Sequence, residues 1–445
     1  MKAARLPRDP GPAGWDKLLA PRVARAALRD EITADWLVIG AGFAGLAAVR
    51  RLTELHPHDS IVLLEAAQVG SGPAGRNSGF MIDLPHDLTS EDYGGALEHD
   101  RAQIAANRHA IAFAANMARD YGLGRAAFDP AGKINGAASE KGEGHNRAYA
   151  KHLEALGEPH ERLDAHAMAQ ITGTRYYRSG LFTPGTVIIQ PAAFVRGVAA
   201  RLVSNRVSLF EESPVTALVR DEGGGWRAQT PGGSVRAGKA ILAVNGHLES
   251  FGFKRRELMH VFTYASMTRP LTRAEAARLG GRPSWGLTPA DPLGTTVRRI
   301  EGADGPRIVI RNRFTYEPSM EVADAALKRI VATHDQSFRA RFPMLPDVTM
   351  AYRWGGRLCL TRNGVGVTEE LEPGLWAACV QNGLGTVRGV LSGLVAAEAA
   401  SGQCSPIALA LLNEAAPRKL PPEPVATLGA RAFLKWGEFR AGAEL

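Results

Sequence analysis

The sequence predicts an α/β fold with two or three domains or subdomains. Three observations predict it: a strand–helix–strand unit in residues 36–65, strands and helices that recur from residue 185 to 402, and a length of 445 residues. The apolar runs "WLVIG" and "SIVLLE" have the length of buried strands, and "AGLAAVRRLTEL" between them has an apolar helical face. Such a unit is typical of a parallel sheet.

Three glycines of this unit form a G-x-G-x-x-G motif, and an acid follows the second strand. Gly40 permits the tight turn, Gly42 lets a pyrophosphate approach the backbone, and Gly45 lets the helix pack on the sheet. The N–H groups at the helix start face the phosphates. Glu65, 20 residues after Gly45, is placed to accept hydrogen bonds from ribose hydroxyls. The unit predicts a dinucleotide site, with NAD and FAD both open at this point.

In the rest of the chain, segments with a periodic apolar pattern alternate with glycine-rich turns. We predict a glycine-rich loop over 66–88, helices over about 89–122 and 147–157, a strand and a helix within 185–205, short strands over 207–247, strands at 259–267, 295–300 and 306–313, a helix over 322–342, and a strand, glycine turn and helix over 374–402.

Composition excludes several classes of protein. Hydrophobic residues make up 45% and charged residues 22%, as in ordinary globular proteins. Cys359, Cys379 and Cys404 lack metal-ligand spacing, so we expect no metal site and a reducing, cytoplasmic location. No apolar run reaches the roughly 18 residues of a membrane span. Residues 1–29 lack the apolar core of a signal peptide and are expected to form a surface lead-in. The net charge of +8 comes without a dense basic run, which argues against nucleic acid as a partner.

From residue 35 to the tail, the chain resembles the D-amino-acid-oxidase-like FAD-dependent oxidoreductases. The likeness rests on "VIGAGFAGL…VLLE", "GPAGRNSGF", "GTVIIQPAAFVRGVA", "VTAL", "AILAVNGH", "TYASMTRPL", "WGGRLCLTR", "NGLGTVRGVLSG" and "LPPEP", in that order. The gamma-glutamylputrescine-oxidase-like branch is the most similar.

The resemblance implies a Rossmann-type FAD-binding domain of the glutathione-reductase-like kind and a second, substrate-capping domain with a mixed sheet. The FAD-binding domain is expected to be discontinuous, with the remaining segments forming the cap. The implied division is 30–90, 180–250 and 355–415 for the FAD-binding domain, 91–179 and 251–354 for the capping domain, 1–29 for the lead-in and 416–445 for a tail.

Carried over by position, the family's motifs imply a non-covalent FAD held along its length. One group of residues would hold the ADP half, a second would line the flavin ring, and glycines before the last helix would present N–H groups to the pyrimidine edge of the flavin. The ADP half is assigned to Gly40, Ala41, Gly42, Phe43, Ala44, Gly45, Glu65 and Ala66, with Val215 at the adenine and Asn245 and Gly246 near the pyrophosphate. The flavin ring is assigned to Arg76, Asn77, Ser78 and Gly79, and its pyrimidine edge to Gly383, Gly385 and Thr386.

Arg76, Tyr264 and Trp354 are the candidate catalytic residues. Arg76 is a candidate for binding a substrate carboxylate or stabilising charge on the flavin, Tyr264 lies on a strand that faces the flavin in the family, and Trp354 is a candidate wall of the pocket. Each residue also has an ordinary structural interpretation: a paired loop arginine, or a core aromatic. Cys359 falls two residues from the position that links flavin covalently in some sarcosine oxidases, and a buried core cysteine is the interpretation we prefer.

Some positions depart from the family. Ala74 stands where the family has serine, and Leu384 where it has histidine, so the flavin edge is less polar than usual. Arg298 and Arg299 alternate on a predicted strand, so at most one of them can point into the pocket. His86 is the histidine nearest the flavin loop and is expected to lie in a surface turn.

The predicted function is oxidation of the C–N bond of an amine or amino acid to an imine by hydride transfer to flavin N5, followed by hydrolysis and reoxidation by oxygen. Arg76 and the net positive charge of the chain favour a substrate with a carboxylate. Two alternatives stay open: an amine dehydrogenase with another electron acceptor, and a flavoprotein subunit of a larger complex that docks through the segment "KWGEFRAGAEL".

Overall fold

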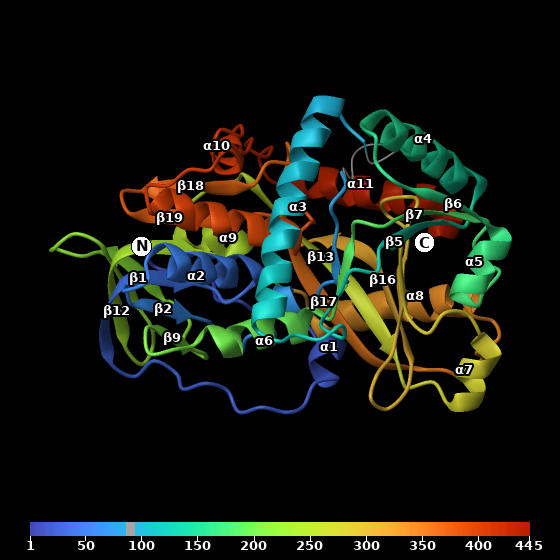
Figure 1. Cartoon of the computed structure of the whole chain (residues 1–445), viewed down its shortest axis with the longest axis horizontal. Helices are drawn as coiled ribbons and strands as arrows, with labels where there is room; N and C mark the ends of the chain where they lie inside the picture. The colour runs from blue at the N-terminus through green and yellow to red at the C-terminus, as the bar shows by residue number, and fades with distance from the viewer. Residues whose placement is uncertain (86–93) are drawn as a thin grey trace.

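Two eight-stranded sheets lie side by side in the computed structural model, which describes residues 1–85 and 94–445 (Figure 1). They confirm the predicted α/β class and the mixed second sheet. The first sheet has the strand order β10-β11-β12-β1-β2-β9, with β19 and then β18 attached to β12. Its strands are β1 (Glu31–Ile39), β2 (Ile61–Leu64), β9 (Val207–Phe210), β10 (Ala217–Arg220), β11 (Trp226–Gln229), β12 (Ser234–Leu242), β18 (Val367–Glu372) and β19 (Leu375–Cys379).

The central strands of this sheet run parallel, and their carboxyl ends are in register. Ile39 of β1 pairs with both Leu64 of β2 and Leu242 of β12, and Leu242 pairs with Ala377 of β19. Strands of a parallel sheet that end together leave a crevice at that edge, where nucleotides bind in doubly wound folds. The residues that follow β1, β2, β12 and β19 therefore meet at one place.

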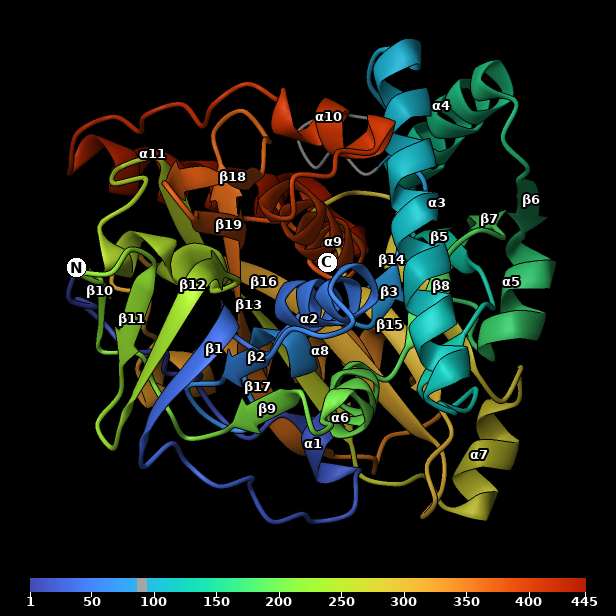
Figure 2. The same cartoon turned by 60° about the vertical axis from the view of Figure 1, so that its left-hand side comes forward.

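Two helices that cover this sheet pack unusually closely. In α2 (Phe43–Leu55) and α9 (Val387–Ala400) the contact is made through glycine: a Cβ on Gly393 would lie 2.0 Å from the carbonyl oxygen of Ala44. Both helices start next to the crevice, because α2 follows β1 and α9 follows β19. The views in Figures 1 and 2 place α6 (Pro191–Leu202) beside α2, and the long α3 (Leu97–Asp120) upright beside both.

The second sheet has the order β17-β13-β16-β15-β14-β5-β7-β6 and is antiparallel except where β14 meets β5. Helices α5, α7 and α8 pack on it through a shared apolar core. Its strands are β5 (Lys133–Ala137), β6 (Glu161–Asp164), β7 (Ser179–Thr183), β13 (Leu258–Thr268), β14 (Trp285–Pro289), β15 (Thr296–Ile300), β16 (Arg307–Tyr316) and β17 (Met350–Thr361).

The remaining elements lie outside the two large sheets. They are the three-stranded sheet of β3 (Phe80–Met81), β8 (Val187–Ile189) and β4 (Phe128–Asp129); helices α1 (Gly14–Lys17), α4 (Glu140–Leu156), α5 (Ala165–Thr172), α7 (Arg273–Leu279), α8 (Asp324–Arg341), α10 (Pro406–Leu412) and α11 (Val425–Ala441); and the 3-10 turns η1 (Pro73–Gly75), η2 (Asn245–Phe251) and η3 (Gly442–Glu444). Among the helices of the described ranges, none has the length and apolar character needed to cross a membrane.

Two sequence predictions are corrected by the fold. Helix α4 begins at Glu140, seven residues before the predicted start, because Ser139 caps it by accepting a hydrogen bond from the N–H of Gly142. Residues 1–29 are not simply a surface segment: Trp15 is 1% exposed and packs edge-on against Trp354. The apolar side chain of Trp15 explains this burial, since it covers the surface between the two sheets. His86 lies outside the described residues.

Candidate active site

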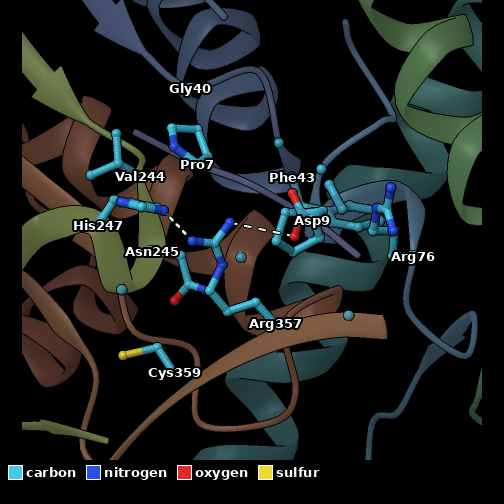
Figure 3. A pocket seen from close by; sticks show the side chains of 18 of the residues that line it. Pro7, Asp9, Gly40, Phe43, Arg76, Val244, Asn245, His247, Arg357 and Cys359 are labelled. Atoms are coloured by element: carbon cyan, nitrogen blue, oxygen red, sulfur yellow. Dashed lines mark hydrogen bonds and ion pairs between the residues drawn. The ribbon is translucent and has the colours of Figure 1, made fainter. Parts of the chain in front are cut away.

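A cavity of about 430 Å³ opens at the carboxyl ends of β1, β2, β12 and β19 and reaches strands β13, β16 and β17 of the second sheet. Its walls come from the glycine loop after β1, the loop before β3, η2, the turn before α9 and, unexpectedly, residues 5–9 of the N-terminal segment. Figure 3 shows the part of the cavity where Asp9, His247 and Arg357 meet.

The glycine loop forms one end of the cavity. Gly40 has φ of +102°, and a Cβ at Gly45 would lie 1.8 Å from the carbonyl oxygen of Gly40, so helix and turn touch through backbone alone. Gly42 faces open space, with Ala74 the nearest neighbour of an added Cβ at 3.5 Å. Gly42 is also the N-cap of α2, and within the described chain no side chain caps that helix start. Its N–H groups are therefore available to an anion.

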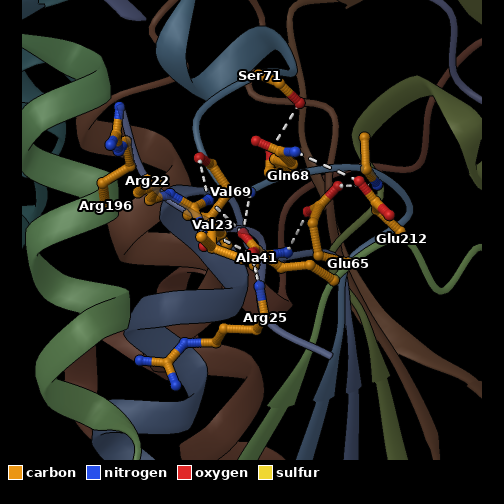
Figure 4. A network of polar contacts seen from close by, with 12 residues as sticks. Arg22, Val23, Arg25, Ala41, Glu65, Gln68, Val69, Ser71, Arg196 and Glu212 are labelled. Carbon is orange, nitrogen blue, oxygen red and sulfur yellow. Dashed lines mark hydrogen bonds and ion pairs between the residues drawn. The ribbon is translucent and has the colours of Figure 1, made fainter. Parts of the chain in front are cut away.

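Glu65 borders the same end and orders the loop. Its carboxylate accepts hydrogen bonds from the N–H of Ala41 at 2.9 Å and of Ala67 at 3.1 Å (Figure 4). Burial raises the pKa of Glu65, and the two N–H donors oppose that rise. Val215, which the family resemblance assigns to the cofactor, also lines the cavity.

Glu211, which the sequence analysis did not single out, fastens the N-terminal segment beside this end. It is fully buried and accepts hydrogen bonds from the Arg22 guanidinium and from the N–H groups of Arg25 and Val69, both at 2.6 Å. Burial opposes its ionisation, yet the bond from Arg22 and the two N–H donors hold the pKa of Glu211 below its usual value. Figure 4 shows Arg22, Arg25 and Val69 close together in this network of polar contacts. Because Glu211 lies far from these partners in the sequence, no local sequence pattern predicts their contacts.

Two loops near the middle of the cavity hold non-glycine residues in the left-handed region. Asn245 has φ of 49° and Asn382 has φ of 47°. Such conformations are uncommon outside glycine and concentrate at functional sites. Gly383, Gly385 and Thr386 follow and line the cavity, and a Cβ at Gly385 would meet nothing within 4 Å. Thr386 is the N-cap of α9 and donates its hydroxyl to the Phe80 carbonyl at 2.5 Å. A second helix start therefore faces the cavity.

One part of the cavity wall holds a buried chain of three polar side chains. Arg357 of β17 donates to His247 Nε2 and to Asp9 Oδ1, the latter at 3.4 Å (Figure 3). Because Arg357 donates to Nε2, the Nδ1 of His247 carries the proton and donates to Ser250 Oγ at 3.0 Å. Burial and then the charge of Arg357 lower the pKa of His247 to about 3, so the ring is neutral at physiological pH. The sequence analysis missed the roles of Asp9 and His247.

Arg76 borders the cavity, but its hydrogen bonds hold the chain together. Its Nη1 donates to the carbonyl oxygens of Pro10 at 3.0 Å, Gly11 at 2.9 Å and Gly355 at 3.1 Å, and its Nε donates to Ser71. Burial lowers the pKa of Arg76. This geometry suits the structural interpretation of Arg76 as a paired loop arginine, because the guanidinium fastens the N-terminal segment to β17.

The other two candidate catalytic residues lie in different places. Tyr264 lines the cavity, but its hydroxyl hydrogen-bonds Thr315 Oγ1 at 2.7 Å, and burial raises its pKa to about 12. Trp354 is not on the wall: it is fully buried behind Arg76 and donates its indole N–H to the Arg76 carbonyl at 2.9 Å. The part of β17 that borders the cavity begins two residues further along, at Gly356 and Arg357.

Of the predicted cofactor-binding residues, Gly45 and Gly79 do not line the cavity, and the others do. A Cβ at Gly79 would lie 2.2 Å from Arg298 Nη1. Arg298 donates to the carbonyls of Ser78 and Ile189, and its burial lowers its pKa to about 9, while Arg299 reaches the carbonyl of Gly280. The two arginines point in opposite directions, and neither enters the cavity.

Several structural features of the cavity suit the expected FAD. Two helix starts and the open sides of Gly42 and Gly385 suit phosphates and a flat ring. In the described part of the chain, Asn245 Oδ1 and Thr263 Oγ1 are buried on this wall with no hydrogen-bond partner. Buried polar atoms are normally paired, so these two suit a ligand.

Three comparisons with known proteins agree with this geometry. Residues 35–399 match the family model described as "DAO: FAD dependent oxidoreductase". The chain is 24% identical over 421 residues to "Probable oxidoreductase OrdL" of Rhizobium meliloti, covering 91% of each chain. It is 24% identical over 385 residues to the gamma-glutamylputrescine oxidoreductase of Escherichia coli, covering 84% of this chain and 85% of that one.

Solved structures show the same fold. Glycine oxidase from Geobacillus kaustophilus superposes with a TM-score of 0.69 at 16% identity, over 86% of this chain and 100% of that one. An L-amino acid deaminase from Proteus myxofaciens superposes with a TM-score of 0.66 at 16% identity, over 91% and 96%. At these identities the likeness concerns the fold.

Proposed function

Since the chain belongs to the DAO family of FAD-dependent oxidoreductases, we propose that it oxidises the C–N bond of a carboxylate-bearing amine or amino acid. The observation that carries this proposal is a single cavity that joins a dinucleotide-binding end, at Gly42 and Glu65, to a cationic end at Arg357 and Arg311. The curated relative named gamma-glutamylputrescine oxidoreductase supports an amine as the substrate class.

FAD, when bound, supplies the hydride acceptor for a substrate carbon next to nitrogen. The residues of the chain orient the substrate and exclude water. Arg357 and Arg311 provide positive charge for a carboxylate, and Thr263 Oγ1 is a hydrogen-bond partner for the amine. The substrate reacts as its neutral amine, because a lone pair must support the departing hydride. Loss of hydride leaves an iminium, which water converts to a carbonyl compound and ammonia or a smaller amine.

We propose that the FAD is not covalently bound. Cys359 borders the cavity, but it is 2% exposed and packs against Gly246, where an added Cβ would lie 3.2 Å from its sulfur. Burial raises the pKa of the Cys359 thiol, so the nucleophilic thiolate is disfavoured. Release of FAD by acid precipitation tests this proposal; a flavin that stays with the precipitated protein would contradict it.

Oxygen as the electron acceptor, the implied domain division and a cytoplasmic location stay predictions. Two alternatives also remain. A dehydrogenase would reduce an artificial acceptor much faster than oxygen, and a subunit of a larger complex would turn over only after its partner is added.

Product analysis tests the reaction itself. The purified protein is mixed in air with amines and amino acids, and carbonyl product, ammonia or smaller amine, and hydrogen peroxide are measured together. The proposal requires one carbonyl per amine released. Oxidation of an alcohol or thioether with every amine left intact would remove the C–N assignment while leaving the flavoprotein fold.

A further inference from the structure

The outer face of α11 carries an apolar stripe that is exposed to solvent. Val425, Leu428, Trp436 and Phe439 are 59%, 64%, 61% and 77% exposed. On a helix these positions fall within one narrow sector, and Ala432 completes the stripe between Leu428 and Trp436. Trp436 and Phe439 lie against each other, with ring centroids 5.8 Å apart. We call these five residues the α11 stripe.

The opposite face of α11 is firmly held, which keeps the stripe outward. Ala430 and Leu434 pack on the apolar cluster of β13 and β16. Glu438 accepts a hydrogen bond from Arg313 at 2.9 Å, and Gly437 lets Leu293 approach so closely that an added Cβ would lie 2.1 Å from it. The chain end beyond the helix is anchored too, since Glu444 accepts bonds from the N–H groups of Ala138 and Ser139.

The exposed cations Arg431 and Lys435 flank the stripe on one side. The only acid of α11 is Glu438, and it is used by Arg313 on the inner face. The outer face thus combines apolar and aromatic side chains with positive charge and carries no carboxylate. A second copy of the same face would meet it with like charges and no acid to pair with them. The charge pattern therefore favours a partner surface that is anionic.

We propose that α11 docks the protein on an anionic lipid bilayer, with the helix lying in the plane of the interface. Trp, Phe and Leu along one side with Lys and Arg beside them are typical of helices that bind this way, because the apolar side enters the headgroup boundary while the cations meet anionic lipid. Arg431 and Lys435 have side chains long enough to reach the headgroups while their stems cover apolar surface. Because the stripe lies on the exposed face of a single helix, it suits contact with a broad surface rather than with a deep cleft.

Co-sedimentation of the full-length, FAD-loaded protein with vesicles tests the proposal. Vesicles of phosphatidylcholine with phosphatidylglycerol are compared with phosphatidylcholine alone. We expect binding to the anionic vesicles, weakening as salt rises. Arg431→Glu with Lys435→Glu should weaken binding by at least about fivefold for each reversed cation. Trp436→Ser with Phe439→Ser should abolish it.

Matched controls separate docking from folding. Val23→Ser with Leu409→Ser makes the same kind of change at exposed apolar residues elsewhere and should bind vesicles like the unaltered protein. All variants should keep their FAD content and Tm, because the altered side chains are exposed. Brominated lipids should quench the fluorescence of the unaltered protein, and Trp436→Phe should lose that quenching while still binding.

Three outcomes would overturn the proposal. They are no preference for anionic vesicles, unchanged binding by the variant Trp436→Ser with Phe439→Ser, and a lipid-free dimer that this variant converts to monomer. The last result would assign the stripe to a second copy. Failure to bind vesicles together with capture of an acidic protein would assign it to a protein partner.

Discussion

Two parts of the cavity wall are built in opposite ways. At the dinucleotide end, the wall comes from five consecutive residues, 40–44, and from Glu65 at the end of the next strand. Around Arg357, the side chains of Asp9, His247 and Arg357 come from three segments that are separated by more than a hundred residues each. The first part is a local motif that packs backbone on backbone. The second is a set of buried polar and charged groups that exists only when the whole chain has folded.

This contrast predicts different responses to mutation. Changes at the dinucleotide end should release FAD, whereas changes at the buried chain around Arg357 should impair substrate binding and stability while FAD is retained. The strongest disturbance is expected where backbone touches backbone.

Gly45→Ala should have the largest effect. The new Cβ would fall 1.8 Å from the carbonyl oxygen of Gly40, and neither backbone can move without opening the phosphate turn. We expect a loss of about 3 kcal/mol or more in the free energy of unfolding, together with loss of FAD. Gly144→Ala in α4 is the control, because its nearest neighbour would be Arg147 Nη2 at 3.8 Å. A yellow, stable Gly45→Ala protein would refute the assigned role of this contact.

Asp9→Asn should come next, and it acts on the buried chain around Arg357. It leaves the nearly buried Arg357 without its carboxylate partner, which typically costs about 3 kcal/mol. Denaturant unfolding and kcat/KM should both suffer, while the Kd for FAD changes little. Asp16→Asn is the matched control. Asp16 lies in the same N-terminal segment as Asp9 and also pairs with an arginine, Arg196, but its side chain is 41% exposed. Equal effects of the two substitutions would remove Asp9 from the site.

These cases show what the sequence can and cannot specify. The positions of Gly40, Gly42 and Glu65 on one cavity wall were predictable because they depend on neighbours within one strand–helix–strand unit. Asp9 was not, because its partner Arg357 lies 348 positions away. Trp354 was placed on the wall wrongly, since only the register of β17 decides that Arg357 faces the cavity. Arg76 was placed near the cavity correctly, but a sequence does not reveal that carbonyls of Pro10 and Gly355 occupy its donors.

Glu65→Ala tests the dinucleotide end without a steric clash. It removes the acceptor of two backbone N–H groups and of the proposed ribose contact. A hydrogen bond to a charged group contributes about 1.5–3 kcal/mol, so the Kd for FAD should rise by about ten- to a hundredfold. Glu54→Ala, on the outer side of α2, should leave FAD affinity unchanged. An unaltered Kd in Glu65→Ala would argue against the ribose contact.

His247→Gln should give the smallest effect, visible in the pH dependence of stability. The folded-state pKa of His247 is about 3, below its ordinary 6.5, so between these values the unfolded chain binds a proton that the folded chain does not. Stability therefore falls as pH is lowered through this window, by up to about 1.4 kcal/mol per pH unit. The variant should lose less stability than the unaltered protein between pH 7 and pH 5, measured by denaturant unfolding at saturating FAD. An identical loss would show that His247 is not buried in its neutral form.

The central claim is best tested by mixing the FAD-loaded protein anaerobically with paired amines and following the visible absorbance of the flavin. Each pair consists of a carboxylate-bearing amine and the same amine with that carboxylate converted to an amide. The account predicts that the carboxylate-bearing amine bleaches the flavin, that its amide does so at least about tenfold less efficiently, and that Arg357→Met narrows this difference. Bleaching by alcohols or thioethers while every amine leaves the flavin yellow would contradict it.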